Sequence, residues 1–375
     1  MKKYGIIIVS FIIICTIATT ACEQGSSGDA YVSQKPTAFV VDPFWPKPLP
    51  NNWILGQVSG VAVDAKDHVW IVHRPLTIST QEGGAAQDPP ISECCVPAPS
   101  VIEFDTEGNL VQAWGGPDSG QQWPASEHGI FVDHQGNVWI GSNGRNDQVV
   151  LKFSPDGKKL LQLGTWDESK GSNDTEYLGR TADIAVDPKT NEVYLADGYG
   201  NRRIIVFDAE TGKYKRHWGA YGEIPNDDEL PAYDSATDPI KSFRSPMHAV
   251  RLSNDGLVYT ADRVNNRIQV FNQDGTFVKE GFIATQTLSM GSVWDIELSR
   301  DEAQTYMYIP DGTNNKVWIL NRESLEVVAS FGRGGRNAGQ FGWVHNAAMD
   351  SKGNLYTTEV ETGKRVQKFR PVAGS

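Results

Sequence analysis

The stretch AVRLSNDGLVYTADRVNNRIQVFNQDG, residues 249–275, holds three short apolar segments separated by polar turns, and it decides the fold. The segments are rich in β-branched and aromatic residues, and the turns contain Asp-Gly and Asn-Asn, which is typical of antiparallel strands. The same order occurs six times along the chain: a segment ending in Asp or Ser, a turn, and an aromatic-rich segment. The six pairs are GVAVD with HVWIVHR, GIFVD with NVWIGSN, DIAVD with EVYLADGYGN, AVRLS with LVYTADRVNN, DIELS with YMYIPDGTNN, and NAAMD with NLYTTEVETG.

Further segments complete most of these units. Third segments such as RIIVFDAETG follow the pairs, and several units close near Trp-Gly or Phe-Gly, as in YKRHWG and VVASFG. A small antiparallel sheet cannot bury both faces alone, so repeated sheets stack around an axis. The sequence therefore predicts an all-β, six-bladed β-propeller over residues 37–371. The last unit lacks an outer strand, and we expect TAFVVDPFWP near residue 40 to supply it and close the ring from the N-terminal side.

Composition and charge limit the possible partners. The chain has 375 residues, 39% of them hydrophobic, which is enough for one large domain or two ordinary ones. Its formal charge is −12 and no basic stripe is visible, so nucleic acid is not an expected partner. We expect a monomer. Two polar insertions, near 75–99 and 222–243, interrupt the repeats, and the second is expected on one rim of the propeller.

The N-terminus has the pattern of a targeting segment. Two lysines precede an apolar run from Tyr4 to Ile17, and small residues lead into Cys22, which resembles a bacterial lipoprotein cleavage box. We expect residues 1–21 to be a signal peptide, Cys22 to carry a lipid, and residues 22–36 to be a flexible tether. The protein is then exported and meets a membrane only through that lipid, on the outer face of a bacterial membrane. Simple secretion, or release into the periplasm, is one alternative, and an uncleaved anchor is another.

Only two cysteines lie beyond this segment, the adjacent pair Cys94-Cys95. Neighbouring cysteines do not form an ordinary cross-linking disulfide without strain. We therefore expect no disulfide scaffold and interpret the pair as a feature of a loop.

Three histidines share one position in the repeat. The first strand of each propeller blade lines the central channel, so the six first strands can be aligned on their terminal Asp or Ser. The residues five positions earlier are Ser59, His128, Ala182, His248, Trp294 and His345. Histidine thus occupies alternate blades, a third of a turn apart, and the three imidazoles are expected to converge on the axis. This predicts a three-histidine metal site with an open fourth position, which suits Zn²⁺ or a similar ion. His134, which lies in a turn, and His68, His73 and His217 fall outside this register.

Other polar residues end the second strands, where side chains can reach the same mouth. They are Arg74, Tyr199 and Arg263. Two arginines beside a metal favour an anionic substrate, because arginine pairs bidentately with a carboxylate. A tyrosine near a metal and two cations loses its proton more readily and can act as a base. The alternative is that these arginines bind strand-end carbonyls or acids such as Asp262.

These residues resemble the peptidyl-α-hydroxyglycine α-amidating lyases. LGQVSGVAVD, HR at His73, HGI at His128, ADGYGN, MHAV, ADRVNNRIQVF and VHN follow the order of that family's motifs, from about Asn52 to Phe369. The resemblance implies a six-bladed propeller of NHL-type repeats. It also implies zinc on His128, His248 and His345, a catalytic tyrosine at Tyr199, and active-site arginines at Arg74 and Arg263.

The resemblance further implies a structural calcium ion in the channel. The backbone carbonyls of Val61 and Ile130 would bind it, together with a position that is aspartate in the family and Asn346 here. An amide oxygen still ligates calcium, although it brings no charge.

The implied reaction is metal-assisted cleavage of a peptidyl- or N-acyl-α-hydroxyglycine to an amide and glyoxylate. The substrate would be a peptide or small molecule with a carboxylate. Two alternatives remain: a propeller hydrolase or lactonase with another substrate, and a non-enzymatic NHL propeller that binds a protein or glycan on one rim.

Overall fold

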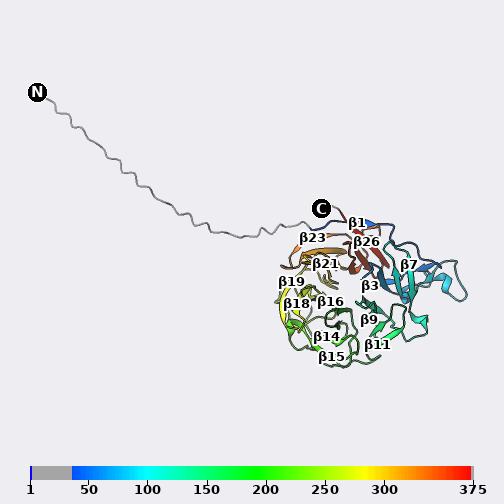
Figure 1. Ribbon diagram of the computed structural model, residues 1–375, viewed down its shortest axis with the longest axis horizontal. Helices are drawn as coiled ribbons and strands as arrows, with labels where there is room; N and C mark the ends of the chain where they lie inside the picture. The colour runs from blue at the N-terminus through cyan, green and yellow to red at the C-terminus, as the bar shows by residue number, and fades with distance from the viewer. Residues whose placement is uncertain (2–35, 373–375) are drawn as a thin grey trace. The chain divides into compact units, whose positions relative to one another are not determined.

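The computed structural model describes residue 1 and residues 36–372, and the propeller lies within the compact unit Pro36–Ser375. The described residues form six four-stranded sheets arranged in a ring, as Figure 1 shows. In blade order the strands are β3 (Gln57–Val63), β4 (Val69–Arg74), β6 (Val101–Phe104) and β7 (Leu110–Trp114); β8 (Glu127–Val132), β9 (Val138–Ser142), β10 (Val149–Phe153) and β11 (Lys159–Gly164); β12 (Asp183–Asp187), β13 (Glu192–Asp197), β14 (Arg203–Asp208) and β15 (Tyr214–Trp218); β16 (Met247–Leu252), β17 (Leu257–Asp262), β18 (Arg267–Asn272) and β19 (Phe277–Phe282); β20 (Glu297–Leu298), β21 (Tyr306–Asp311), β22 (Lys316–Asn321) and β23 (Val327–Phe331); and β24 (Val344–Met349), β25 (Leu355–Glu359), β26 (Arg365–Pro371) and β1 (Phe39–Asp42). The predicted six-bladed all-β propeller is confirmed.

The ring closes through the N-terminal strand. In Figure 1 the blue β1 lies beside the red β26, and the two pair antiparallel from Phe39 opposite Pro371 to Asp42 opposite Lys368. The sixth blade therefore takes its outer strand from the other end of the domain, as predicted from the sequence.

Local chemistry explains why the first strand of four of the blades ends in an aspartate. The carboxylate of Asp133, after β8, accepts backbone N–H bonds from Gln135 and Asn137 and a bond from the indole of Trp139 on β9. It thus fixes both the turn and the side chain packed behind it. His134 lies exposed in this turn.

The apolar core lies between the blades. Each of the six clusters of buried apolar side chains joins two neighbouring blades, the first and sixth included. The first strands of most neighbouring blades also contact one another around the axis. Because burial is achieved between the sheets, the channel inside the ring can carry polar side chains.

Several details depart from the regular repeat. In the fifth blade the first strand is reduced to β20, so the segment that carries Trp294 is irregular. The insertion at 75–99 holds the 3₁₀ turns η1 (Pro75–Thr77) and η2 (Gly84–Ala86) and the strand β5 (Val96–Pro97), which pairs parallel with β2 (Trp53–Ile54). The remaining 3₁₀ turns are η3 (Pro117–Ser119), η4 (Ala220–Gly222) and η5 (Arg263–Asn265).

The second insertion lies at the rim where the second strands of the blades end. Its Tyr233 donates to the carbonyl of Thr285, and the carbonyl of Asp228 accepts from Arg202, which follows the second strand of the third blade. The same rim carries the turns after Asp197 and Asp262, and so it surrounds one mouth of the channel.

Cys94 and Cys95 are joined by a disulfide, which differs from the expectation of an unbridged pair. The bond closes a small ring over the two residues themselves and ties no distant segments together, so the fold is still not a disulfide scaffold.

The predicted signal peptide, the lipid site Cys22 and nearly all of the tether fall outside the described residues. Within residues 36–372, we find no helix of the length and apolar character that crossing a membrane requires.

Candidate metal centre and active site

Three histidines from alternate blades meet in the channel. His128 lies on β8, His248 on β16 and His345 on β24, and each is at most 2% exposed. Their ligand nitrogens lie within 4.8 Å of one another, and their ring centroids are 4.7 to 5.0 Å apart. The structure therefore brings together the three histidines that the repeat register had selected.

A bulge in each first strand aims the imidazole. The pairing register shifts between Met247 and Ala249 on β16, where His248 lies. The same shift occurs at His128 on β8 and at His345 on β24. A β-bulge adds one residue to a strand and re-aims its side chain, and bulges are common beside active sites. A bulge therefore accompanies each of the three histidines, and β3 has one at the equivalent Ser59.

The other ring nitrogen of each histidine is held by the next blade around the ring. Nδ1 donates to a backbone carbonyl in all three cases. The pairs are His128 with Ala182 (2.7 Å), His345 with Ser59 (2.7 Å) and His248 with Trp294. The three acceptors occupy the histidine register in the blades that lack histidine. Since a carbonyl can only accept, Nδ1 carries the proton and Nε2 keeps its lone pair for the axis.

Burial keeps these imidazoles neutral. It lowers the pKa of His128 and His248 well below the usual value and that of His345 to about 3. The neighbouring imidazoles and the charges of Arg74 and Arg263 lower the pKa values further. Neutral imidazole is the form that binds a metal, so the three residues fit a Zn²⁺-type ion without first losing a proton.

Tyr199 lies directly over two of the histidines. Its phenolic oxygen is 2.9 Å from Nε2 of His128 and 3.2 Å from Nε2 of His248. The carbonyl of Tyr199 accepts bonds from Arg180 (2.7 Å) and from the hydroxyl of Ser245 (3.0 Å), which fixes the turn after β13. The hydroxyl is therefore held beside the nitrogens that would bind a metal.

Arg74 ends β4 and reaches the same place. Its Nε donates to the carbonyl of Glu127 (2.7 Å), and its terminal nitrogens donate to the side chains of Gln57 (3.0 Å) and Asn143 (3.3 Å). The expectation that such an arginine binds a strand-end carbonyl thus holds for one of its nitrogens. Its charge also interacts with Tyr199, and burial lowers its pKa, although an arginine stays protonated in a protein.

Arg263 begins η5 and is 3% exposed. Its guanidinium lies 4.3 Å from the ring centre of Trp294 and bonds to Tyr199. Its Nε is buried and has no hydrogen-bond partner among the described residues. Asp262, the acid that could have bound it, forms its ion pair with Arg267. A buried cation with a donor left over is suited to bind an anion in the channel.

Two of the residues proposed for calcium line one cavity together with a cation, and the third is a neutral amide. Val61 and Ile130 line a cavity of about 530 Å³ that they share with the charged side chain of Arg251. The amide oxygen of Asn346 accepts a bond from Nδ1 of His345 (2.7 Å). A guanidinium in the cavity, and an amide that is neutral and already engaged, do not fit a second divalent ion there.

Sequence reasoning did not single out the residues that hold the arginines. Gln57 and Asn143 look like any other polar residues at strand ends. Trp294 stood in the histidine register, so its place in the channel was expected, but its contact with Arg263 was not.

Comparisons with known proteins agree with this geometry. The NHL repeat model matches residues 248–271. Peptidyl-glycine alpha-amidating monooxygenase B of Xenopus laevis is 26% identical over 367 residues, which cover 94% of this chain and 38% of that protein. Peptidyl-alpha-hydroxyglycine alpha-amidating lyase 1 of Drosophila melanogaster is 26% identical over 379 residues, covering 94% of this chain and 62% of that protein. The chain thus spans only part of the length of either relative.

Among solved structures, a streptogramin B lyase superposes with a TM-score of 0.52 at 14% identity, covering 89% of this chain and 98% of that one. At this identity the likeness establishes the propeller fold alone. The similarity in sequence goes further, because it runs along almost the whole chain at modest identity. The chain is thus similar, at modest identity and over most of its length, to proteins named as peptidyl-α-hydroxyglycine α-amidating lyases, and part of its fourth blade matches the NHL repeat.

Proposed function

We propose that this protein is a metal-dependent lyase that cleaves the C–N bond of peptidyl- or N-acyl-α-hydroxyglycines to an amide and glyoxylate. The observation that carries the proposal is the cluster at the channel mouth. Three neutral imidazoles there face one point under the hydroxyl of Tyr199, beside the buried Arg263 with an unused donor. Similarity along 94% of the chain to a protein named for this lyase activity supports it.

His128, His248 and His345 would hold the metal through Nε2, and we propose Zn²⁺ because three imidazoles with an open position suit that ion. When bound, the metal supplies a Lewis acid for the oxygens of the substrate. The carbonyls of Ala182, Ser59 and Trp294 keep the ligand nitrogens aimed through Nδ1.

Tyr199 is the proposed base. In its ionised form it takes the proton of the substrate's α-hydroxyl. The oxygen then forms a C=O bond as the C–N bond breaks, and the electron pair of that bond goes to nitrogen, which takes up a proton to become the amide. The net change moves one proton from oxygen to nitrogen and needs no water. Tyr199 can return the proton, since the same group serves as base and then as acid.

Arg74 and Arg263 are the proposed carboxylate-binding residues. Arg263 has the free Nε, and its guanidinium plane is fixed on the ring of Trp294, so little side-chain freedom is lost when an anion binds. Both charges lie near Tyr199 and so favour the negative charge that develops in the reaction.

The substrate needs a supplying reaction. A glycine must first gain a hydroxyl on its α-carbon, which is a reaction of the monooxygenase class. This chain covers 38% of the relative named as a monooxygenase. We propose that this propeller acts as a monomer on a peptide or small carboxylate.

Metal content tests the proposal first. We would express residues 23–375, measure bound metal by mass spectrometry, and compare His248→Ala with the exposed control His134→Ala. We expect about one zinc per chain in the wild type and the control and a loss of zinc in His248→Ala. A folded, metal-supplied protein without stoichiometric metal would refute the lyase and leave a non-enzymatic propeller.

Glyoxylate release is the second test. We expect N-benzoyl-α-hydroxyglycine to give benzamide and glyoxylate in equal amounts with the zinc-loaded protein, and none with His248→Ala. Zinc binding without glyoxylate from acyl or peptidyl substrates would contradict the proposed reaction and favour a propeller hydrolase of another specificity.

We also propose that the protein is exported and anchored by a lipid on Cys22. Support comes from the leader pattern. The full chain should partition with membranes and carry an acylated N-terminal cysteine by mass spectrometry, whereas Cys22→Ala should not. Equal fractionation of both forms would contradict the lipid anchor.

A further inference from the structure

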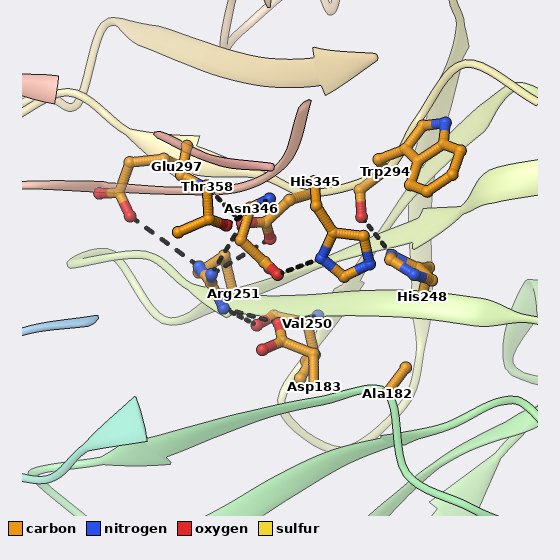
Figure 2. Close-up of polar contacts among 12 residues, drawn as sticks. Ala182, Asp183, His248, Val250, Arg251, Trp294, Glu297, His345, Asn346 and Thr358 are labelled. Carbon is orange, nitrogen blue, oxygen red and sulfur yellow. Dashed lines mark hydrogen bonds and ion pairs between the residues drawn. The ribbon is translucent and has the colours of Figure 1, made fainter. Parts of the chain in front are cut away.

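A group of charged side chains lies in the channel beyond the histidines. Arg251 on β16 donates to Asp183 on β12 at 2.6 Å and to both carboxylate oxygens of Asp295 at 3.1 and 3.2 Å. Its Nε is 3.9 Å from Glu297, which also pairs with Arg300 at 3.2 Å. In Figure 2 Arg251 lies at the centre of this group, with dashed contacts toward Asp183 and Glu297 and with His345 close by. We call Asp183, Arg251, Asp295 and Glu297 the channel cluster.

The channel cluster joins consecutive blades. Asp183 also accepts the backbone N–H of Val250 at 3.0 Å, which links the third blade to the fourth. Asp295 accepts the N–H of Ala347 at 2.9 Å, which links the fifth blade to the sixth. Arg251 bonds to both acids and so connects the two links. Val250 and Ala347 each lie two residues beyond a channel histidine.

The charges show what Arg251 contributes. Burial raises the pKa of Asp183 and that of Glu297, while the charge of Arg251 opposes both shifts. Three carboxylates face two guanidinium groups, of which Arg300 stands at the more exposed edge. Without Arg251, three carboxylates would face one guanidinium. The negative charge left unbalanced would then be the amount that one divalent cation neutralises. Buried acids need such compensation, because an unpaired buried charge is strongly destabilising.

The position of Arg251 is also informative. It lines the cavity of about 530 Å³ to which Val61 and Ile130 contribute. Asn346, at the position where a carboxylate ligand would complete a calcium site, is neutral and accepts from His345. This part of the channel therefore has a guanidinium, at Arg251, and an amide rather than a carboxylate, at Asn346.

We propose that Arg251 is a built-in cation that takes the place of a structural divalent metal in the channel, so the propeller holds one metal ion only, at the histidines. This inference concerns the channel cluster and does not depend on the reaction catalysed at the histidines.

The wild-type protein gives the first test. We would titrate Ca²⁺ into the zinc-loaded, full propeller by calorimetry and follow the Tm with 5 mM Ca²⁺ or with a calcium-selective chelator. We expect no calcium binding and a Tm shift of less than about 1 °C, since no site is open to the ion. One equivalent of bound calcium, with a raised Tm, would overturn the proposal whatever the variants do.

Variants give the second test. Arg251→Ala should lower the Tm by about 10 °C, because it leaves buried acids unpaired. Added Ca²⁺ should recover more than half of that shift, and the double variant Arg251→Ala/Asn346→Asp should bind Ca²⁺ more tightly. Arg300→Ala is the matched control, because it removes the other guanidinium that pairs with Glu297, at the more exposed edge. We expect it to lower the Tm less than Arg251→Ala does, and we expect added Ca²⁺ to leave its Tm unchanged.

If Arg251→Ala does not fold, Arg251→Lys and Arg251→Met provide the same comparison, because only lysine keeps the charge. We expect Arg251→Lys to lie closer to the wild type in Tm and Arg251→Met to gain stability from Ca²⁺. A methionine variant as stable as the lysine variant and indifferent to calcium would overturn the proposal.

Discussion

At the scale of single residues, the partners of a histidine decide its role. His128, His248 and His345 each donate from Nδ1 to a carbonyl and leave Nε2 toward the axis. His73 is equally buried, but both of its nitrogens bond to the backbone: Gly56 donates to Nδ1 at 3.1 Å and Nε2 donates to the carbonyl of Pro99 at 3.0 Å. His73 is therefore structural, while the other three are available to a metal.

Tyr199→Phe tests the proposed base. The change removes only the phenolic oxygen, which lies 2.9 Å from Nε2 of His128. We expect kcat to fall by about 10²- to 10⁴-fold, as for loss of a positioned proton acceptor, with zinc content unchanged. Glyoxylate release close to the wild-type rate would show that another group takes the proton.

His73 predicts a pH dependence of stability. Burial lowers its pKa to about 4, whereas an exposed histidine titrates near 6.5. Between those values the unfolded chain binds a proton that the folded chain does not. The contribution is therefore fully present above pH 6.5 and is lost as the pH falls toward 4, reaching about 3 kcal/mol.

The check compares urea unfolding of the wild type and His73→Asn at pH 7, 5.5 and 4.5, both without zinc. Asparagine can accept from Gly56 without taking up a proton, so its free energy of unfolding should fall less with acid. The exposed His134→Asn should follow the wild type. Parallel curves for all three proteins would contradict the assignment.

At the scale of elements, the bulge in the first strand of a blade is the device that builds the centre. It re-aims one side chain of β8, β16 and β24 while the rest of each strand keeps its ladder. The carbonyl that fixes that side chain comes from the next blade. Each metal-binding histidine thus depends on its own strand and on a carbonyl from the next blade. Blades that carry a histidine therefore alternate with blades that supply the carbonyl.

Gly129→Ala tests the contact between β8 and β12. A Cβ at Gly129 would stand 2.6 Å from the carbonyl oxygen of Ala182, the acceptor that fixes His128. We expect zinc affinity, measured by competition with a chromogenic chelator, to fall by about 10- to 100-fold, the usual effect of disturbing a partner of a metal-binding histidine.

Gly334→Ala is the matched control, because a Cβ there meets nothing closer than 3.8 Å. Its zinc affinity should equal that of the wild type. Equal affinities for both glycine variants would mean that the neighbouring blade does not position His128.

At the scale of the whole molecule, the ring is held by blade-to-blade packing and one closing strand. Each cluster of apolar side chains serves two blades, so a blade removed from the ring would expose two surfaces. β1 pairs with β26, and its Phe39 packs 5.5 Å from Tyr308 and 5.4 Å from Phe331, ring centre to ring centre. The two ends of the domain thus meet in the sixth blade, which also carries His345.

Removing β1 should open the ring. A chain that starts at residue 43 exposes the edge of β26 and the apolar surface that Phe39 covers. We expect the Tm to drop by about 10 °C or more relative to a chain that starts at residue 36, with a tendency to aggregate. Equal Tm values and equal zinc content would show that closure by β1 is dispensable.

The sequence by itself determined the parts that repeat. Alternating segments, turn residues and a common register are local properties, so they predicted six blades, the closing strand and the channel positions of the histidines and Trp294. The ends of the second strands pointed to Arg74, Tyr199 and Arg263, the family resemblance added their catalytic roles, and the structure places the three residues together at one mouth.

Only the tertiary structure decided which groups hold these residues. Ser59 and His345 are 286 positions apart and meet because the ring closes, and Arg251 finds Asp183 and Asp295 on two other blades. The bulges, the Cys94–Cys95 bond and the role of Gln57 and Asn143 were likewise invisible. A periodic pattern predicts which face of a strand is buried. Contacts between blades depend instead on how the sheets pack around the axis, and no local stretch of sequence encodes that packing.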